Sequence, residues 1–176
     1  MTEKLYYQDS FLREFDARVT ACTPCADGRW AVELDATAFF PEGGGQAADP
    51  GTLGGAQVLD VQETGGAILH TLDAPLPVGE TVHGTLDWST RLRRMQDHTG
   101  EHIFSGLVHR HYGYANTGFH LGDGGMTVDY GGELSAAQIT QLEEEANLAV
   151  FENDPLRPRF PRRRSWRSWN TAASWR

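Results

Sequence analysis

Apolar and polar residues alternate in short runs through the first half of the chain, between residues 17 and 87. These runs are rich in β-branched and aromatic residues, and they read "RVTACTPC", "RWAVELD", "AQVLDVQE", "AILHTL" and "TVHGTLDW". Glycine and proline separate them, and Asp27-Gly28 is a hairpin signal between the first two. Short strands at this spacing predict a small, glycine-rich β-barrel over residues 1–87.

From Asp87 onward the apolar positions take the period of a helix. The pattern predicts a helix near residues 90–112 that ends at Gly113. Its inward face is expected to carry Leu92, Met95, Thr99, His102 and Gly106.

A second helix is predicted near residues 136–152, where Ser135 and Gln138 form a capping box. Its inward side chains are expected to be Ile139, Leu142, Ala146 and Ala149. Two strands, "NTGFHLG" and "GMTVDYG", lie between the helices with Gly124-Gly125 at their turn. Residues 88–154 should therefore form a two-layer α+β unit, and the fold class is α+β. Two strands are few for two helices to cover, so the unit looks incomplete at its C-terminal end.

Composition narrows the possible classes of protein. No run of about 18 apolar residues occurs, so no membrane span is expected. The N-terminus lacks the features of a secretory signal, and Cys22 and Cys25 are too few for a disulfide framework, so a reducing cytoplasm is expected. The chain through Asp154 holds all 24 acidic residues and 8 of the 15 basic ones. A body this acidic excludes a general nucleic-acid coat protein.

The only internal basic cluster is "RLRR", which contains Arg91, Arg93 and Arg94. Phosphate contacts need such a local patch. For these three residues we nevertheless expect a solvated first turn of the helix.

The segment "QDHTGEHIFSGLVHRHYG" places His98 and His102 one helical turn apart, on the face of Met95. Both imidazoles are expected to point inward, either as ligands of one zinc ion or as satisfied core histidines. Glu101 stands beside His102 and is a candidate general base by position. Gly100 costs about 1 kcal/mol relative to alanine inside a helix, which indicates a close approach of backbone or ligand there.

The segment "DATAFFPEGGGQAADPG" is the second informative stretch. Gly43, Gly44 and Gly45 permit positive φ or the close approach of a ligand. Thr37 precedes them and Gln46 follows at once. A loose barrel loop is the alternative, but the order of threonine, two aromatics, proline, glutamate, glycines and glutamine does not suit a random linker.

Together these stretches resemble the editing module of alanyl-tRNA synthetase and the freestanding alanyl-tRNA editing proteins of AlaX type. The matching text is "TAFFPEGGGQAADPG", "VHGTLDWSTRLRRMQDHTGEHIFSGLV", "GFHLGDGGMTVDY" and "LEEEANLAVFENDP". The resemblance implies a glycine-rich β-barrel followed by an α+β core. It also implies a zinc-dependent hydrolase whose partner is tRNA for alanine mischarged with serine or glycine. Phe40 stands where the family usually has tyrosine, which removes a hydroxyl.

The resemblance further implies roles for individual residues. His98 and His102 would be metal ligands, and the predicted catalytic residues are Glu101, Gln46 and Thr37. The predicted substrate-binding residues are Thr37, Gly43, Gly44, Gly45, Gln46 and His120. A zinc ion can activate water or polarise an ester carbonyl. A group that hydrogen-bonds the serine hydroxyl, such as Thr37, would disfavour alanine because alanine would leave that group unpaired.

The family completes its zinc site with a later C-x-x-x-H, but this chain has no cysteine after Cys25 and no histidine after His120. It ends in "PRRRSWRSWNTAASWR", which holds 3 of the 5 tryptophans and no acid. With TGG for Trp and the codons AGG, AGC, AAT, ACC and GCA for Arg, Ser, Asn, Thr and Ala, a shifted frame from Arg163 reads EELEELEYRSKLE. We hypothesise that residues 155–176 are a basic tail translated out of frame, which leaves two of the four expected zinc ligands. The nucleotide sequence decides this.

Three alternative functions stay open from the sequence. H-x-x-E-H is also the inverzincin metallohydrolase signature, with Glu101 as base and a third ligand among Glu143, Glu144 and Glu145. The chain could instead be a non-catalytic tRNA-binding fragment, or its tail could bind RNA or a membrane surface. Gly-Gly-Gln also occurs in peptide-release factors, but the acidic flanks of this loop do not suit ribosome binding.

Cys22 and Cys25 have two interpretations. They could complete a Cys2His2 zinc site with His98 and His102, or they could be half-buried core thiols on a barrel strand. The second is expected, because 72 residues separate Cys25 from His98.

Overall fold

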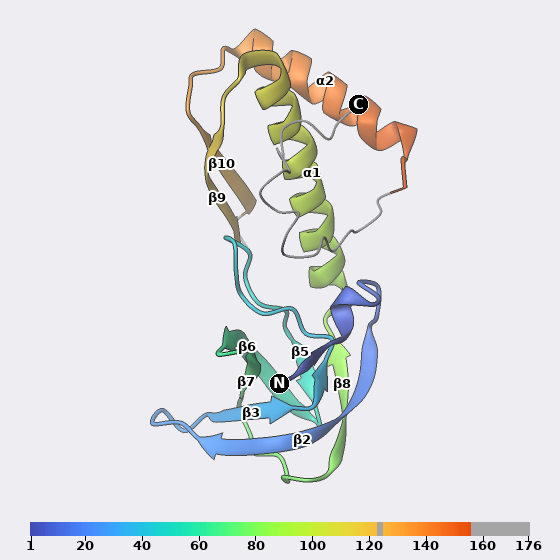
Figure 1. Cartoon of the computed structure of the whole chain (residues 1–176), viewed down its shortest axis with the longest axis vertical. Coiled ribbons are helices and arrows are strands. Elements are labelled where there is room, and N and C mark those ends of the chain that lie inside the picture. Colours follow the sequence, from blue (N-terminus) through green and yellow to red (C-terminus); the bar gives the residue numbers. More distant parts are fainter. Residues whose placement is uncertain (123–124, 156–176) are drawn as a thin grey trace, which may run out of the picture. The chain divides into compact units, whose positions relative to one another are not determined.

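The computed structural model describes residues 1–122 and 125–155 (Figure 1). The predicted turn residue Gly124 and the basic tail from residue 156 lie outside the described residues. The chain divides into two compact units. The first comprises Met1–Met95 and Leu121–Gly125, and the second comprises Gln96–His120 and the described part of the chain from Met126 on.

The first unit is built on an antiparallel sheet of six strands. These are β2 (Glu14–Pro24), β3 (Trp30–Leu34), β5 (Gly51–Leu53), β6 (Ala56–Thr64), β7 (Ala67–Leu72) and β8 (Thr81–Leu86). Their hydrogen-bonded order is β2-β3-β7-β6-β5-β8, and β8 pairs back onto β2, which closes the sheet into a barrel. All five alternating runs of the sequence contribute a strand to it.

Short elements flank this sheet. β1 (Glu3–Lys4) pairs in parallel with β4 (Ala36–Thr37), and a single turn of 3-10 helix, η1 (Leu5–Tyr7), follows β1. The sequence pattern missed β1, β4 and β5, since two- and three-residue strands carry no readable alternation.

The interior of the barrel takes alternate side chains from each strand. Along β2, for example, Phe15, Ala17 and Val19 are buried while their neighbours are exposed. Gly84 on β8 makes room for the ring of Phe15, because a Cβ at residue 84 would lie 2.5 Å from Cε1 of that ring. Each large apolar side chain buried in this way contributes about 1.5–3 kcal/mol.

The second unit has the predicted order of helix, strand, strand and helix. Its elements are the greater part of α1 (Trp88–Tyr112), then β9 (Asn116–Gly122), β10 (Gly125–Tyr130) and α2 (Ala136–Glu152). β9 and β10 form a two-stranded sheet of their own. The α+β class predicted from the sequence is therefore confirmed. In the part of the chain that the structure describes, no helix is both long enough and apolar enough to cross a membrane.

Local signals in the sequence set the helix ends. The carboxylate of Asp87 accepts from the backbone N–H of Thr90 at 3.1 Å, which caps the start of α1. Gly113 takes a φ of +72° and ends this helix, as predicted. The capping box of Ser135 and Gln138 is present at the start of α2.

The predicted inward face of α2 is only partly right. Leu142 is fully buried, and Ala146 and Ala149 are half-buried. Ile139 is 38% exposed, so its assignment to the core was wrong. With one fully buried apolar side chain, α2 has a weak apolar stripe for a helix of 17 residues.

A histidine lies inside the barrel. His70 on β7 is fully buried, with Nδ1 3.1 Å from the carbonyl oxygen of Val32 and Nε2 2.9 Å from Oγ1 of Thr37. Because a carbonyl only accepts, Nδ1 carries the proton and Nε2 accepts from the Thr37 hydroxyl. Burial lowers the pKa of His70 from 6.5 to about 4, so the ring is neutral at neutral pH.

His70 should make the stability of the barrel depend on pH. Its pKa is lower in the folded chain than in the unfolded chain, so the contribution is complete above about pH 6.5 and is lost as the pH falls from about 6.5 to about 4. Between pH 7 and pH 5 the loss should be about 2 kcal/mol. Denaturant unfolding at several pH values measures it.

The matched pair of variants is His70→Asn and His83→Asn. His83 is an exposed barrel histidine that contacts Asp16 at 2.9 Å. The slope of stability against pH should flatten in the first variant and keep its wild-type value in the second. If His70→Asn keeps the wild-type slope of stability against pH, the pH dependence arises from other titratable groups.

Candidate active site

Polar residues make up most of the buried stripe of α1. The positions with the least exposure are Arg91, Arg94, Glu101 and Val108, at 3%, 6%, 2% and 0%. Their spacings of three and seven residues place them along one face of a helix. The sequence pattern predicted that His102 would lie on the inward face of this helix, and that prediction was wrong because His102 is exposed.

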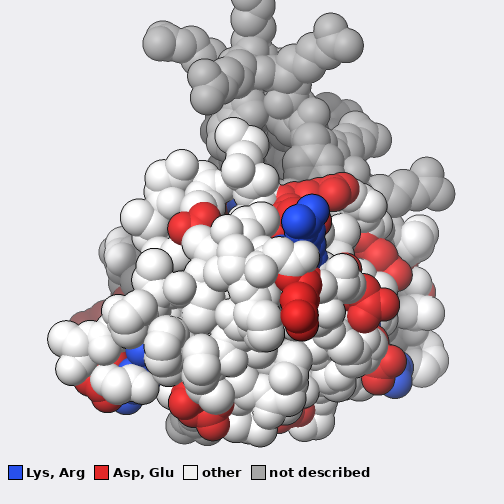
Figure 2. All heavy atoms as spheres, turned by 90° about the horizontal axis from the view of Figure 1, so that it is seen from below, with Lys and Arg blue, Asp and Glu red and all other residues white. Residues whose placement is uncertain are grey.

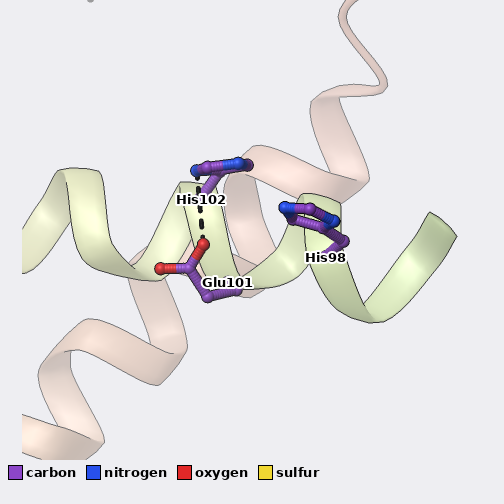
Figure 3. A group of neighbouring side chains, drawn as sticks. All are labelled: His98, Glu101 and His102. Carbon is purple, nitrogen blue, oxygen red and sulfur yellow. Dashed lines mark ion pairs between the residues drawn. The ribbon is translucent and has the colours of Figure 1, made fainter. Parts of the chain in front are cut away.

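His98, Glu101 and His102 form a compact group on one turn of α1 (Figure 3). Their candidate ligand atoms all lie within 4.8 Å of one another. The two imidazole rings stack with their centroids 4.9 Å apart and an interplanar angle of 26°. Oε2 of Glu101 lies 3.2 Å from Nδ1 of His102 (Figure 3). The spacing found in the sequence thus brings the three side chains together.

Glu101 is the buried member of the group, and hydrogen-bond donors surround its carboxylate. Oε1 accepts from the hydroxyl of Ser105, and also from Nδ2 of Asn116 at 2.8 Å. The Ser105 hydroxyl in turn lies 2.9 Å from the hydroxyl of Tyr130. A carboxylate with two donors at Oε1, from α1 and β9, and with His102 beside Oε2 is not poised to take a proton from a water molecule. The geometry therefore does not favour the predicted role of Glu101 as general base.

Sequence reasoning missed Ser105, Asn116 and Tyr130. Each is an ordinary polar residue on α1, β9 or β10, and no spacing in the sequence connects it to Glu101. Their partnership arises only once the hairpin β9–β10 packs against α1.

His98 is half-buried against the ring of Phe119, with the two centroids 5.2 Å apart. Burial lowers the pKa of His98, and the neighbouring His102 lowers it further, while Glu101 opposes both effects. A neutral imidazole is the form that binds a metal ion. Phe119 was missed, whereas its neighbour His120 was predicted to bind substrate. Because successive side chains of a strand alternate between faces, His120 lies on the other face of β9 from Phe119.

The donor set suits a divalent transition metal such as zinc, since imidazole nitrogens and a carboxylate oxygen are usual zinc ligands. No other group of three or more possible ligands occurs among residues 1–122 and 125–155. Cys22 and Cys25 are free, half-buried thiols and do not belong to this group.

The glycine triplet forms a tight turn. Gly43 and Gln46 exchange backbone hydrogen bonds of 3.0 Å, and Gly44 and Gly45 between them take φ values of +60° and +85°. Positive φ at both central residues is the type I′ geometry, which explains the two glycines. The turn is fixed to β9 because the N–H of Leu121 donates to the carbonyl of Gly45 at 2.8 Å. Residues 42–45 are exposed.

A buried ion pair closes the base of this loop. Both Nε and Nη2 of Arg91 donate to Oδ2 of Asp49, the former at 2.7 Å, and Nη2 also donates to the carbonyl of Ala38 at 2.5 Å. Oδ2 of Asp49 accepts from the N–H of Phe40 at 2.7 Å as well. Arg91 thereby ties the two ends of the loop to each other.

Arg94 has a related role. It donates to the carbonyls of Ala47 and Ala48 on the same loop. The prediction that "RLRR" is a solvated turn was thus wrong for Arg91 and Arg94, which are buried, and right for the exposed Arg93. Two of the three guanidinium groups serve the interior of the first unit rather than a phosphate-binding surface.

Thr37 and Gln46 are also buried, at 0% and 7% exposure. The Thr37 hydroxyl donates to His70 and accepts from the N–H of Phe39 at 3.2 Å. Its oxygen therefore has at most one further lone pair for a ligand. The substrate-binding roles of Thr37, Gln46 and His120 stay predictions.

Comparison with known proteins finds alanine–tRNA ligases and alanyl-tRNA editing proteins that match most of the chain. Alanine–tRNA ligase of Thermococcus kodakarensis is 39% identical over 162 residues, which are 86% of this chain. The alanyl-tRNA editing proteins AlaX-L of Pyrococcus horikoshii and Aarsd1 of Danio rerio are 37% and 35% identical over 89% and 88% of the chain. The chain contains an AlaX-like editing domain.

The matched AlaX-like region is only part of each relative. The chain spans 40% of AlaX-L, 39% of Aarsd1 and 17% of the ligase. No protein-family model matches the chain. The relationship therefore rests on the similarity to individual proteins.

Loss of the buried ion pair should unfold the AlaX-like domain more easily. Arg91→Met leaves Asp49 charged and buried, which should lower the free energy of unfolding by about 3–5 kcal/mol. Arg93→Met, on the exposed side of the same helical turn, should change it by about 1 kcal/mol or less. Denaturant titration compares the two variants. Equal losses would show that Arg91 contributes no more than a surface arginine.

The glycine turn should be sensitive at one position and tolerant at the next. Gly44→Ala places a side chain at positive φ and should cost about 1–2 kcal/mol of stability. Gly43→Ala should be nearly neutral, because a Cβ there meets no atom within 4 Å and φ is not positive. The midpoints of thermal unfolding test this contrast, and a large loss in Gly43→Ala would contradict it.

Proposed function

We propose that the chain is a trans-editing deacylase, which hydrolyses the aminoacyl ester of tRNA for alanine mischarged with serine or glycine. The observation that carries the proposal is the group of His98, Glu101 and His102 in a chain that is 35–39% identical to named editing proteins and ligases. We propose zinc as the cofactor, held by His98 and His102.

The zinc ion would supply an activated water or a polarised ester carbonyl. His98 and His102 would hold it through neutral imidazoles, and the lowered pKa of His98 supports that form. Glu101 would orient rather than transfer a proton, because donors already occupy its carboxylate. His102 has a side chain that is 67% exposed, which leaves room for a substrate on its outer side.

Substrate selection is proposed for the loop and for Thr37. The exposed backbone of Gly43, Gly44 and Gly45 would pass close to the aminoacyl end, and Gln46 would stand beside it. The free lone pair of the Thr37 hydroxyl would accept from the hydroxyl of serine, which alanine lacks. Because Thr37 is fully buried, the side chains over it must move for this contact to form.

The metalloprotease interpretation has less support. It needs Glu101 as a base, and it needs a third ligand from residues 143–145. Glu101 is buried and hydrogen-bonded, while Oε2 of Glu145 lies 2.8 Å from Nε2 of His111.

Binding of tRNA would have to be local. On the face shown in Figure 2, blue basic side chains lie singly beside red acidic ones, without a broad basic patch. Through Asp154 the chain carries 24 acidic and 8 basic residues, so its long-range field repels nucleic acid. Recognition of a single acceptor end is compatible with this charge, whereas wrapping a duplex is not.

The test is hydrolysis of seryl-tRNA for alanine by the whole 176-residue chain, with and without added zinc. Only the zinc-loaded chain should release serine, at a low rate because two histidines do not complete a four-ligand site. His98→Ala should reduce release to that of the enzyme-free control. His109→Ala, at the exposed end of the same helix, should leave it unchanged.

Two outcomes would overturn the proposal. Zinc-dependent peptide hydrolysis without deacylation would identify a metallohydrolase of another class. Binding of the tRNA with no hydrolysis at any zinc concentration would identify a non-catalytic fragment.

A further inference from the structure

The buried Glu101 carboxylate has different partners at its two oxygens. Its two oxygens face different ways: Oε1 accepts from Ser105 and Asn116, and Oε2 faces Nδ1 of His102 at 3.2 Å. This division gives the carboxylate a fixed orientation.

A short chain of hydroxyl groups supports that orientation. Ser105 has a single proton, which it donates to Oε1 of Glu101, so the Tyr130 hydroxyl must donate to Ser105. Burial raises the pKa of Tyr130, and the charge of Glu101 raises it further, which keeps this phenol protonated as a donor. The chain therefore runs from Tyr130 through Ser105 to Glu101, with every donor directed toward the carboxylate.

Apart from Glu101, the printed contact of His102 is its stacking on the ring of His98, with the centroids 4.9 Å apart. The side chain is 67% exposed, and stacking alone does not decide which ring nitrogen carries the proton. A carboxylate beside one ring nitrogen favours the proton on that nitrogen and leaves the other nitrogen with its lone pair.

We propose that Glu101 is the positioning residue of the His98–His102 pair, holding the His102 imidazole with its proton on Nδ1 so that Nε2 is presented as the metal-binding atom. Ser105, Asn116 and Tyr130 act through Glu101 in the same way. This inference rests on the proposed zinc site. The position of the His102 proton, however, can be measured in the metal-free chain.

The experiment uses the 176-residue chain with histidines labelled with ¹⁵N. In the metal-free chain, two-dimensional NMR at pH 8 reports which ring nitrogen of His102 carries the proton. Zinc affinity is then measured by competition with a chelator of known affinity. The test variant is Glu101→Gln. The matched control is Glu145→Gln, because Glu145 on α2 also contacts a histidine of α1, namely His111.

In the wild type the proton of His102 should reside on Nδ1. In Glu101→Gln, Ser105 and Asn116 retain the amide oxygen, so the amide NH₂ faces Nδ1 and moves the proton to Nε2. Zinc affinity should then fall about 10–100-fold, as expected when the partner of a metal-binding histidine is lost. Glu145→Gln should change neither His102 nor the affinity.

An unchanged proton position in Glu101→Gln would overturn the inference, as would an unchanged zinc affinity. Should this variant fail to fold, Ser105→Ala tests the same inference. It leaves Glu101 in place but removes one of its donors, so the proton of His102 should be divided between Nδ1 and Nε2. Absence of zinc binding and of deacylation in the wild type would overturn the proposed function alone. The proton position in the metal-free variants would still decide the role of Glu101.

Discussion

The buried ion pair between Arg91 and Asp49 is the interaction on which the arrangement of the first unit depends. Removing two charges from water is costly, and attraction offsets that cost only with good geometry and further hydrogen bonds. Here the guanidinium donates to Asp49, Ala38 and Ser10, and the carboxylate also accepts from the N–H of Phe40. One charged pair thus fixes the base of the glycine loop and the first turn of α1 together. The loop between these anchors can then be exposed and still have a defined shape.

The same principle recurs farther along α1. An ordinary amphipathic helix buries a stripe of apolar residues, but this one buries Arg91, Arg94 and Glu101 before it reaches Val108. Each buried charge is compensated locally: the arginines by loop carbonyls and Asp49, and Glu101 by Ser105 and Asn116. Buried apolar side chains would also stabilise this helix, and they would need less exact geometry than buried charged groups do. Charged groups instead give specific orientation, and specific orientation is what a loop base and the proposed pair of metal-binding histidines need.

This polar stripe explains which features could be predicted from the sequence. Helix ends followed from local chemistry, since Gly113 and the capping box at Ser135 act on their own neighbours. The barrel strands followed from alternation. The inward face of α1 did not, because hydrophobic periodicity assumes that buried residues are apolar. His102 was placed inside and Arg91 outside, the reverse of the structure. Ser105 and Tyr130 were invisible for a different reason, as their contacts with Glu101 depend on tertiary packing.

The five residues from His98 to His102 show why a motif does not determine a mechanism. H-x-x-E-H is compatible with a protease in which the glutamate activates water, and with a hydrolase in which it only orients a ligand. The choice depends on which neighbouring side chains contact the carboxylate and which of its oxygens they occupy. A base needs an oxygen open to solvent and a site for the proton that it receives. Glu101 is 2% exposed, its Oε1 has two donors, and its Oε2 faces His102. Under the proposed function, the residues that favour orientation over proton transfer are therefore Ser105 and Asn116, which lie outside the motif.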